Sequence, residues 1–204
     1  MAEPLGVLSA ALAFTVIAAS PGPANLAAAS FAMAAGRAKG MRFALGLGLG
    51  LFFWGLLAAM GLGAVLQSSG WALTVLKIMG AAYLLWLALQ SLRAARRGGS
   101  TIAARAAPRH LFWSGLMLNL SNPKAVFAWM ATLSLGLGDA GQAYLPLMLL
   151  CGLIGLVNYI GWVAFFSTEV MMRAYLRARR WIEAGVGLLL GAAGLSLLRS
   201  SASQ

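Results

Sequence analysis

The chain has 204 residues, of which 61% are hydrophobic and only 9% are charged. A soluble domain carries about 25% charged residues and is about half apolar, so this composition excludes an ordinary soluble domain and points to lipid as the solvent. The formal net charge is +11, from 15 Lys and Arg against 4 Asp and Glu, but the apolar content argues against a basic domain that binds nucleic acid.

Six stretches of the chain are long and apolar enough to cross a membrane. A spanning helix needs about 20 mostly apolar residues. In chain order the stretches cover about residues 5–31, 43–66, 71–91, 111–137, 143–166 and 181–198. The sequence therefore predicts an all-α integral membrane protein with six transmembrane helices in one domain, residues 1–204.

The connections between these stretches alternate in charge. The first, third and fifth are basic, whereas the second is uncharged and the fourth has only Asp139. Short loops rich in Lys and Arg stay in the cytoplasm, so the odd-numbered connections are predicted inside and both termini in the periplasm. The basic residues of these three connections are Arg37, Lys39, Arg42, Arg93, Arg96, Arg97, Arg105, Arg109, Arg173, Arg177, Arg179 and Arg180. This pattern predicts a multi-pass inner-membrane protein whose cytoplasmic face contacts anionic lipids.

The first and fourth stretches are both long and interrupted by proline. They begin two three-helix halves, about residues 1–95 and 108–204, joined by a basic cytoplasmic loop. An odd number of spans per half gives the halves opposite orientations. Broken helices at corresponding positions of such halves are typical of inverted-repeat transporters with a site near the midplane.

The first interruption is Pro21-Gly22-Pro23, followed by Asn25. Each proline lacks an N–H and clashes with the preceding turn. In hydrocarbon the freed carbonyls need partners, so such backbone is found only inside protein or beside a wet cavity. A kinked but continuous helix is the alternative, and two prolines around a glycine favour a true break.

The second interruption is Asn122-Pro123-Lys124. Asn122 is suited to cap the half-helix that Pro123 begins. Lys124 falls near mid-membrane, where a charge costs at least about 2.5 kcal/mol. In one role, its ammonium binds substrate or takes part in proton coupling. In the other, it donates hydrogen bonds to the carbonyls that the break frees. The sequence leaves both roles open.

These two breaks together predict a substrate site for a carboxylate. The first N–H groups of each half-helix lack internal partners and carry about half a positive charge. The predicted binding residues are Pro21, Gly22, Pro23, Asn25, Asn122, Pro123 and Lys124.

Other polar residues are weaker candidates. Asn158 and Tyr159 are candidates for the pathway, and Lys77 for coupling, although Lys77 is close enough to the outer face to snorkel. Glu169 and Glu183 are expected at the membrane interface, paired with nearby arginines.

Glycine spacing predicts close helix packing. Gly46 and Gly50, and Gly187 and Gly191, have the four-residue spacing that lets helices approach closely. That packing is expected within the fold or between the subunits of a homo-oligomer.

Enzyme and metal signatures are absent from the sequence. The single cysteine, Cys151, excludes an internal disulfide or a dithiol pair. With one histidine, one cysteine and four carboxylates, neither a metal site nor acid–base catalysis is expected, and no cofactor or ATP-binding motif is present.

Several motifs together resemble the LysE/RhtB family of amino-acid exporters. They occur in the order and spacing of that family over nearly the whole chain, as residues 20–26, 36–40, 44–48, 80–87 and 122–124. The resemblance implies six helices, export of amino acids or their derivatives, and coupling to the ion gradient. Residues 50–54 depart from the family, because they lack the acidic residue that many members carry in the second span.

The sequence thus predicts a secondary transporter that exports small amino acids or related zwitterions across the inner membrane by alternating access. Export of another small polar metabolite or organic ion is one alternative. A passive channel or membrane scaffold is the other.

Overall fold

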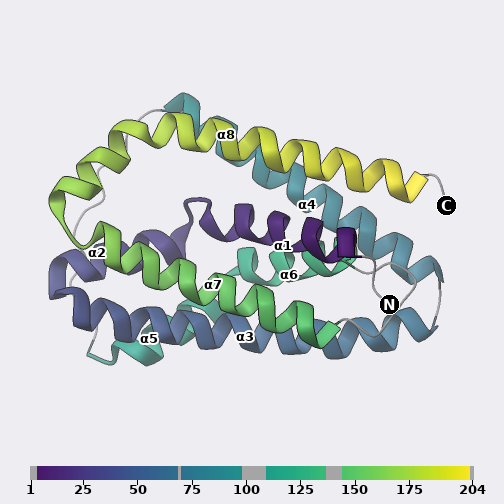
Figure 1. The fold of residues 1–204 in the computed structure, drawn as a ribbon, viewed down its shortest axis with the longest axis horizontal. Coiled ribbons are helices and arrows are strands. Elements are labelled where there is room, and N and C mark those ends of the chain that lie inside the picture. The colour runs from purple at the N-terminus through teal and green to yellow at the C-terminus, as the bar shows by residue number, and fades with distance from the viewer. Residues whose placement is uncertain (1–3, 69, 98–108, 137–143, 203–204) are drawn as a thin grey trace.

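The structure, a computed structural model, describes residues 4–68, 70–97, 109–136 and 144–202, and all regular elements there are helices (Figure 1). This part of the chain confirms the all-helical prediction. The helices are α1 (Pro4–Ala19), α2 (Pro23–Ala35), α3 (Arg37–Ser68), α4 (Gly70–Arg97), α5 (Leu111–Leu120), α6 (Pro123–Gly136), α7 (Tyr144–Phe166) and α8 (Glu169–Ala202).

Both predicted helix breaks are present. α1 ends at Ala19 and α2 begins at Pro23, with a bend of 51° between them. α5 ends at Leu120, and α6 begins at Pro123. Proline is at the first position of each new helix because its missing N–H would have no intrahelical partner there.

Four of the described helices contain a stretch long and apolar enough to cross a membrane: Arg37–Gly61, Ile78–Arg97, Leu145–Phe166 and Glu169–Arg199. The bent pair α1 and α2 makes a fifth if counted as one span. α5 is a shorter apolar helix, and its union with α6 as the sixth span stays a prediction.

α8 begins twelve residues before the predicted sixth stretch, at Glu169 rather than about residue 181. Arginine is a good helix former, so the basic connection continues the helix. Glu169 and Arg173 pair one turn apart at 3.9 Å on its exposed surface.

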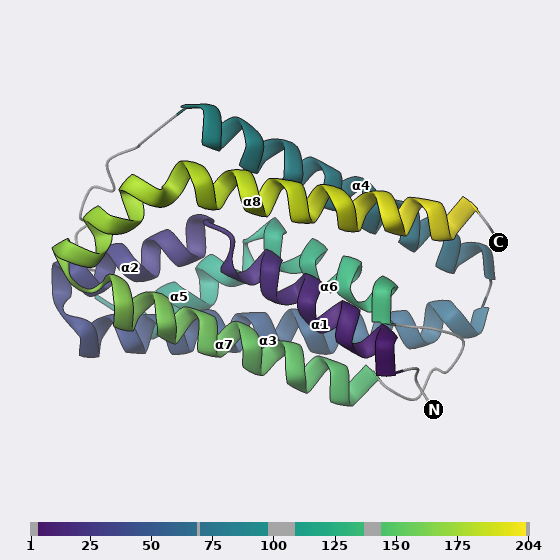
Figure 2. The ribbon, with the colours of Figure 1, turned by 45° about the horizontal axis from the view of Figure 1, so that its top comes forward.

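The helices form three tiers, with α1, α2 and α6 in the middle (Figures 1 and 2). α4 and α8 pack together on one side, and α3 packs against α5 and α7 on the other. α1 packs against α6 between these tiers. Helices at corresponding places in the two predicted halves therefore pair directly, α3 with α7 and α4 with α8.

Glycines set the close approaches between these helices. A Cβ on Gly46 would meet the backbone carbonyl of Phe112, and one on Gly115 would meet that of Phe43. A Cβ on Gly187 would lie 2.7 Å from Leu92 Cγ. The packing predicted for the spaced glycines is thus found within the fold.

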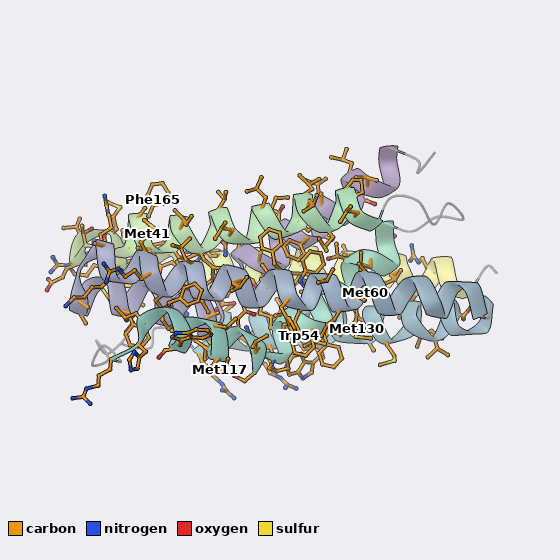
Figure 3. The ribbon with its side chains drawn as sticks, turned by 90° about the horizontal axis from the view of Figure 1, so that it is seen from below. Met41, Trp54, Met60, Met117, Met130 and Phe165 are labelled. Atoms are coloured by element: carbon orange, nitrogen blue, oxygen red, sulfur yellow. The ribbon has the colours of Figure 1, made fainter. Side chains whose placement is uncertain are left out.

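The outer surface is apolar, as lipid requires. Large hydrophobic side chains such as Met60, Met117 and Phe165 are more than half exposed, and Figure 3 shows them along the outside of the bundle. In the core, the Phe14 and Trp129 rings lie 4.9 Å apart.

Basic side chains gather at one end of the bundle, where side-chain nitrogens cluster in Figure 3. There, the Arg37 guanidinium at the start of α3 donates a 2.6 Å hydrogen bond to the Ala164 carbonyl near the end of α7. The first and fifth connections therefore lie side by side, as the charge alternation predicts for two cytoplasmic loops.

Candidate functional site

The two helix breaks meet through Lys124, in the first turn of α6. Its ammonium donates to the Ser20 carbonyl oxygen at 2.8 Å and to Ser20 Oγ at 2.6 Å. Ser20 lies at the end of α1, where the break removes the helical N–H donors that its carbonyl would otherwise use. Lys124 therefore does satisfy a freed carbonyl, which is one of the two roles that the sequence left open.

Gly22 makes room for this lysine. A Cβ at Gly22 would lie 3.1 Å from Lys124 Nζ and 3.3 Å from Cδ. The backbone there is extended, with φ −152° and ψ 171°, which any residue adopts. The glycine is thus explained by close approach and not by backbone conformation.

Asn122 caps α6. Its side-chain oxygen accepts a 3.1 Å hydrogen bond from the Lys124 backbone N–H, the predicted capping role. The start of α2, in contrast, has Gly22 at the cap and no side-chain cap. Its Ala24 and Asn25 N–H groups therefore point out of the helix end with no intrahelical acceptor.

Asn25 is turned toward the first break. Its amide donates to the Ala18 carbonyl at 2.7 Å and to the Ser20 carbonyl at 3.1 Å. Asn158, from α7, donates to the same Ala18 carbonyl at 3.0 Å and to Asn25 Oδ1 at 3.1 Å. Side chains from three helices thus replace the hydrogen bonds that the break removes from α1, as buried backbone requires.

A second polar contact holds the last turn of α5. Asn119 is fully buried, and its amide donates to the Leu47 carbonyl at 2.6 Å and to the Tyr159 hydroxyl at 2.9 Å. Sequence reasoning did not select Asn119. Its place in the same short polar segment as Asn122, just before the second break, was the available signal.

Two cavities border on Lys124. The larger, about 460 Å³, lies between the break segments and the α4–α8 pair. The smaller, about 30 Å³, lies between α1, α3, α6 and α7 and is lined by Asn25 and Tyr159, among apolar side chains such as Phe14 and Leu51. Gly22, Asn122 and Lys124 line both cavities, so this group separates them.

Glu183 lines the larger cavity with Arg179, one turn earlier on α8. Their side chains are 4% and 16% exposed, and the closest N–O contact is 3.6 Å. The predicted pairing with an arginine is present, and α8 packs along α4 with the Glu183 side chain turned into the bundle. Its position at the membrane interface stays a prediction. Ser91 and Gln90, which the sequence did not single out, line the same cavity from α4.

The predicted site residues thus come together at the two cavities. Those lining the larger one are Pro21, Gly22, Pro23, Asn122, Pro123 and Lys124. Lys77 is in α4, and its side chain lies outside the described residues. Within the described ranges, no three His, Cys, Asp or Glu side chains are grouped as a metal would need.

Comparison with known proteins decides the family. The family model "LysE type translocator" matches residues 15–201. The chain belongs to the LysE-type translocators. The translocator is 30% identical over 188 residues to the threonine efflux protein of Salmonella typhi, covering 89% of this chain and 91% of that one.

Two further relatives have related names. The threonine efflux protein of Escherichia coli K12 is 28% identical over 202 residues, which is 95% of the translocator and 97% of that protein. The homoserine/homoserine lactone efflux protein of Salmonella typhimurium is 33% identical over 116 residues, 56% of each chain. No solved structure matches significantly.

Proposed function

We propose that this LysE-type translocator exports small amino acids or related zwitterions across the inner membrane as a secondary transporter. The observation that carries the proposal is the meeting of two proline-broken helices, through Lys124, at a cavity of about 460 Å³. This volume is within the range of about 300–1,000 Å³ for small-molecule sites. Relatives named for the efflux of threonine and homoserine support substrates of this size.

The substrate carboxylate binds at the breaks. An ammonium has three N–H donors, and the described bonds to Ser20 use two of those on Lys124. The uncapped start of α2 adds partial positive charge beside the lysine. Lys124 thus combines both roles left open by the sequence, holding a freed carbonyl and attracting an anion.

Transport proceeds by alternating access between two inverted three-helix repeats. The direct, antiparallel pairing of α3 with α7 and of α4 with α8 supports an axis in the membrane plane. Gly40 approaches Val163 near one end of the α3–α7 pair, and Gly48 approaches Leu156 farther along. The larger cavity includes Ala94 and Arg179 toward the basic end, so this conformation is the one that faces the cytoplasm.

Counterflow in proteoliposomes tests the function. A carrier loaded with unlabelled L-threonine or L-homoserine should accelerate uptake of the labelled amino acid and should saturate. A channel gives no stimulation from the opposite side, and a scaffold gives no flux. Absence of counterflow across a panel of small neutral amino acids would reject the proposed function.

Substrate analogues test the carboxylate site. Threoninamide, which lacks the carboxylate, should compete with L-threonine at least about tenfold more weakly, because it loses a hydrogen bond to a charged group. An amide that competes as well as the acid would show that the breaks do not bind the carboxylate.

A further inference from the structure

The larger cavity has charges of opposite sign on opposite walls. Lys124 lines it from α6, beside the breaks, and Glu183 lines it from α8. The two groups interact electrostatically, yet the described ion pairs join Glu183 to Arg179 and not to Lys124. In the described contacts the ammonium and the carboxylate therefore have different partners, Ser20 and Arg179.

Glu183 is an unusual residue to bury in an apolar bundle. It is 3% exposed, and a carboxylate is buried only at a free-energy cost that partners must offset. Its contact with Arg179 is 3.6 Å, longer than the roughly 2.7–2.9 Å of a strong charged hydrogen bond. Ser91 adds a side-chain hydrogen bond. A carboxylate has about four acceptor sites, so these partners leave acceptor capacity facing the cavity.

We infer that Glu183 binds the ammonium group of the substrate, opposite the carboxylate site at Lys124 and the helix breaks. The inference rests on the proposed function and names its second recognition contact. A zwitterion that bridges the two walls matches both charges, whereas a simple carboxylate or a simple amine matches one. Arg179 is a positioning residue that holds Glu183 from the preceding turn of α8 and lines the same wall.

Two variants on α8 test this assignment. Glu183→Gln keeps the shape and removes the charge, and Glu169→Gln is the matched control, because Glu169 is 85% exposed on the same helix. The probes are L-threonine and its 2-hydroxy analogue, in which a hydroxyl replaces the ammonium. Each is measured by equilibrium binding to purified protein in detergent, and L-threonine also by counterflow.

Glu183→Gln should weaken L-threonine binding by about 10- to 100-fold, the loss of a charged hydrogen bond, and should leave 2-hydroxy acid binding within about twofold. Glu169→Gln should leave both unchanged. Equal weakening of both probes by Glu183→Gln, or no weakening of either, would overturn the assignment.

Removing one member of a buried ion pair destabilises a protein, so the double variant Arg179→Gln with Glu183→Gln provides a second test. It removes both charges and should show the same selective loss of L-threonine binding. Unchanged preference for L-threonine over the 2-hydroxy acid in the double variant would overturn the assignment.

The two readouts separate this inference from the proposed function. Counterflow that does not depend on Glu183 would reject the subsite and keep the exporter. Glu183-dependent binding without counterflow would reject the exporter and keep the subsite. Wild-type protein that neither binds nor exchanges any small neutral amino acid would reject both.

Discussion

At the scale of single residues, Lys124 joins the two halves of the molecule. Its ammonium bonds to Ser20, 104 residues earlier in the chain, and its backbone N–H bonds to Asn122. Charge inside an apolar bundle is costly and is found where it serves a site or a pathway. The contact with a freed carbonyl explains how this lysine is tolerated, and the larger cavity beside it is the space that the proposed substrate occupies.

Lys124→Met should abolish export while the protein still reaches the membrane. The change removes the positive charge and the third N–H donor that the proposed site offers to the carboxylate, so substrate affinity should fall by at least about 10- to 100-fold. Lys39→Met, an exposed position in α3, is the control and should export normally. Lys77→Met should do less than Lys124→Met, because Lys77 is predicted to reach the outer interface. Normal counterflow by Lys124→Met would restrict Lys124 to a structural role.

Asn25 is predicted to contact substrate, and in this structure its amide donates hydrogen bonds to the Ala18 and Ser20 carbonyls. Asn25→Ala should therefore lower the free energy of unfolding by about 1–3 kcal/mol, because it removes two buried hydrogen bonds worth about 0.5–1.5 kcal/mol each. Thermal unfolding in detergent measures this. Ser9→Ala, at an exposed hydroxyl of α1, should unfold like the wild type. If Asn25→Ala had normal stability but weakened L-threonine binding, the result would indicate that Asn25 contacts substrate and has little effect on stability.

At the scale of elements, the contact between α3 and α5 depends on glycine. The two helices are close enough for Gly46 and Gly115 each to face a backbone carbonyl of the other helix. Small residues at such crossings are typical of membrane helices, where packing and not water drives association. This contact supports α5, a short helix that ends at the second break.

Gly115→Ala should destabilise the protein by about 1–3 kcal/mol, as overpacking does. Backbone cannot move aside as a flexible side chain can. Gly161→Ala is the control, because a Cβ at Gly161 meets nothing within 4 Å and alanine is the better helix former. Melting temperatures that fall equally, or not at all, for the two variants would contradict this account of the crossing.

At the scale of the whole molecule, the larger cavity extends from the helix breaks to Ala94 and Arg179, toward the end that bears the basic connections. Lys39 and Arg173 are exposed there. A hydrogen bond from Arg37 to the Ala164 carbonyl joins the first and fifth connections. Positive loops are retained in the cytoplasm, so the end bearing the larger cavity is predicted to face the cytoplasm, with both termini in the periplasm.

Cysteine labelling tests this topology. Cys151 is fully buried and is replaced by alanine in the background. Cysteines at Lys39 and Arg173 should react with an impermeant thiol reagent only after the membrane is opened. A cysteine at Ser69, which lies outside the described residues, should react in intact cells. The reverse labelling pattern would show that the molecule has the opposite orientation in the membrane, with the larger cavity toward the periplasm.

The sequence by itself determined the class of fold and where the helices break. Long apolar stretches have no alternative to helix in lipid, and proline ends a helix by local chemistry. These causes act within a few residues, so α2 and α6 begin at the predicted Pro23 and Pro123. The motifs around them likewise indicated the family that the whole-chain comparison then established.

Only the tertiary structure decided which way the polar side chains face. A helix that is apolar over most of its surface has no clear amphipathic pattern, so its sequence does not indicate which side faces the interior of the bundle. The sequence alone could not predict that Glu183 faces the cavity from α8. Nor could it predict that the Asn25 amide donates to the Ala18 and Ser20 carbonyls. Ser20 and Lys124 meet across 104 residues, and that contact exists only once the two halves have packed against each other.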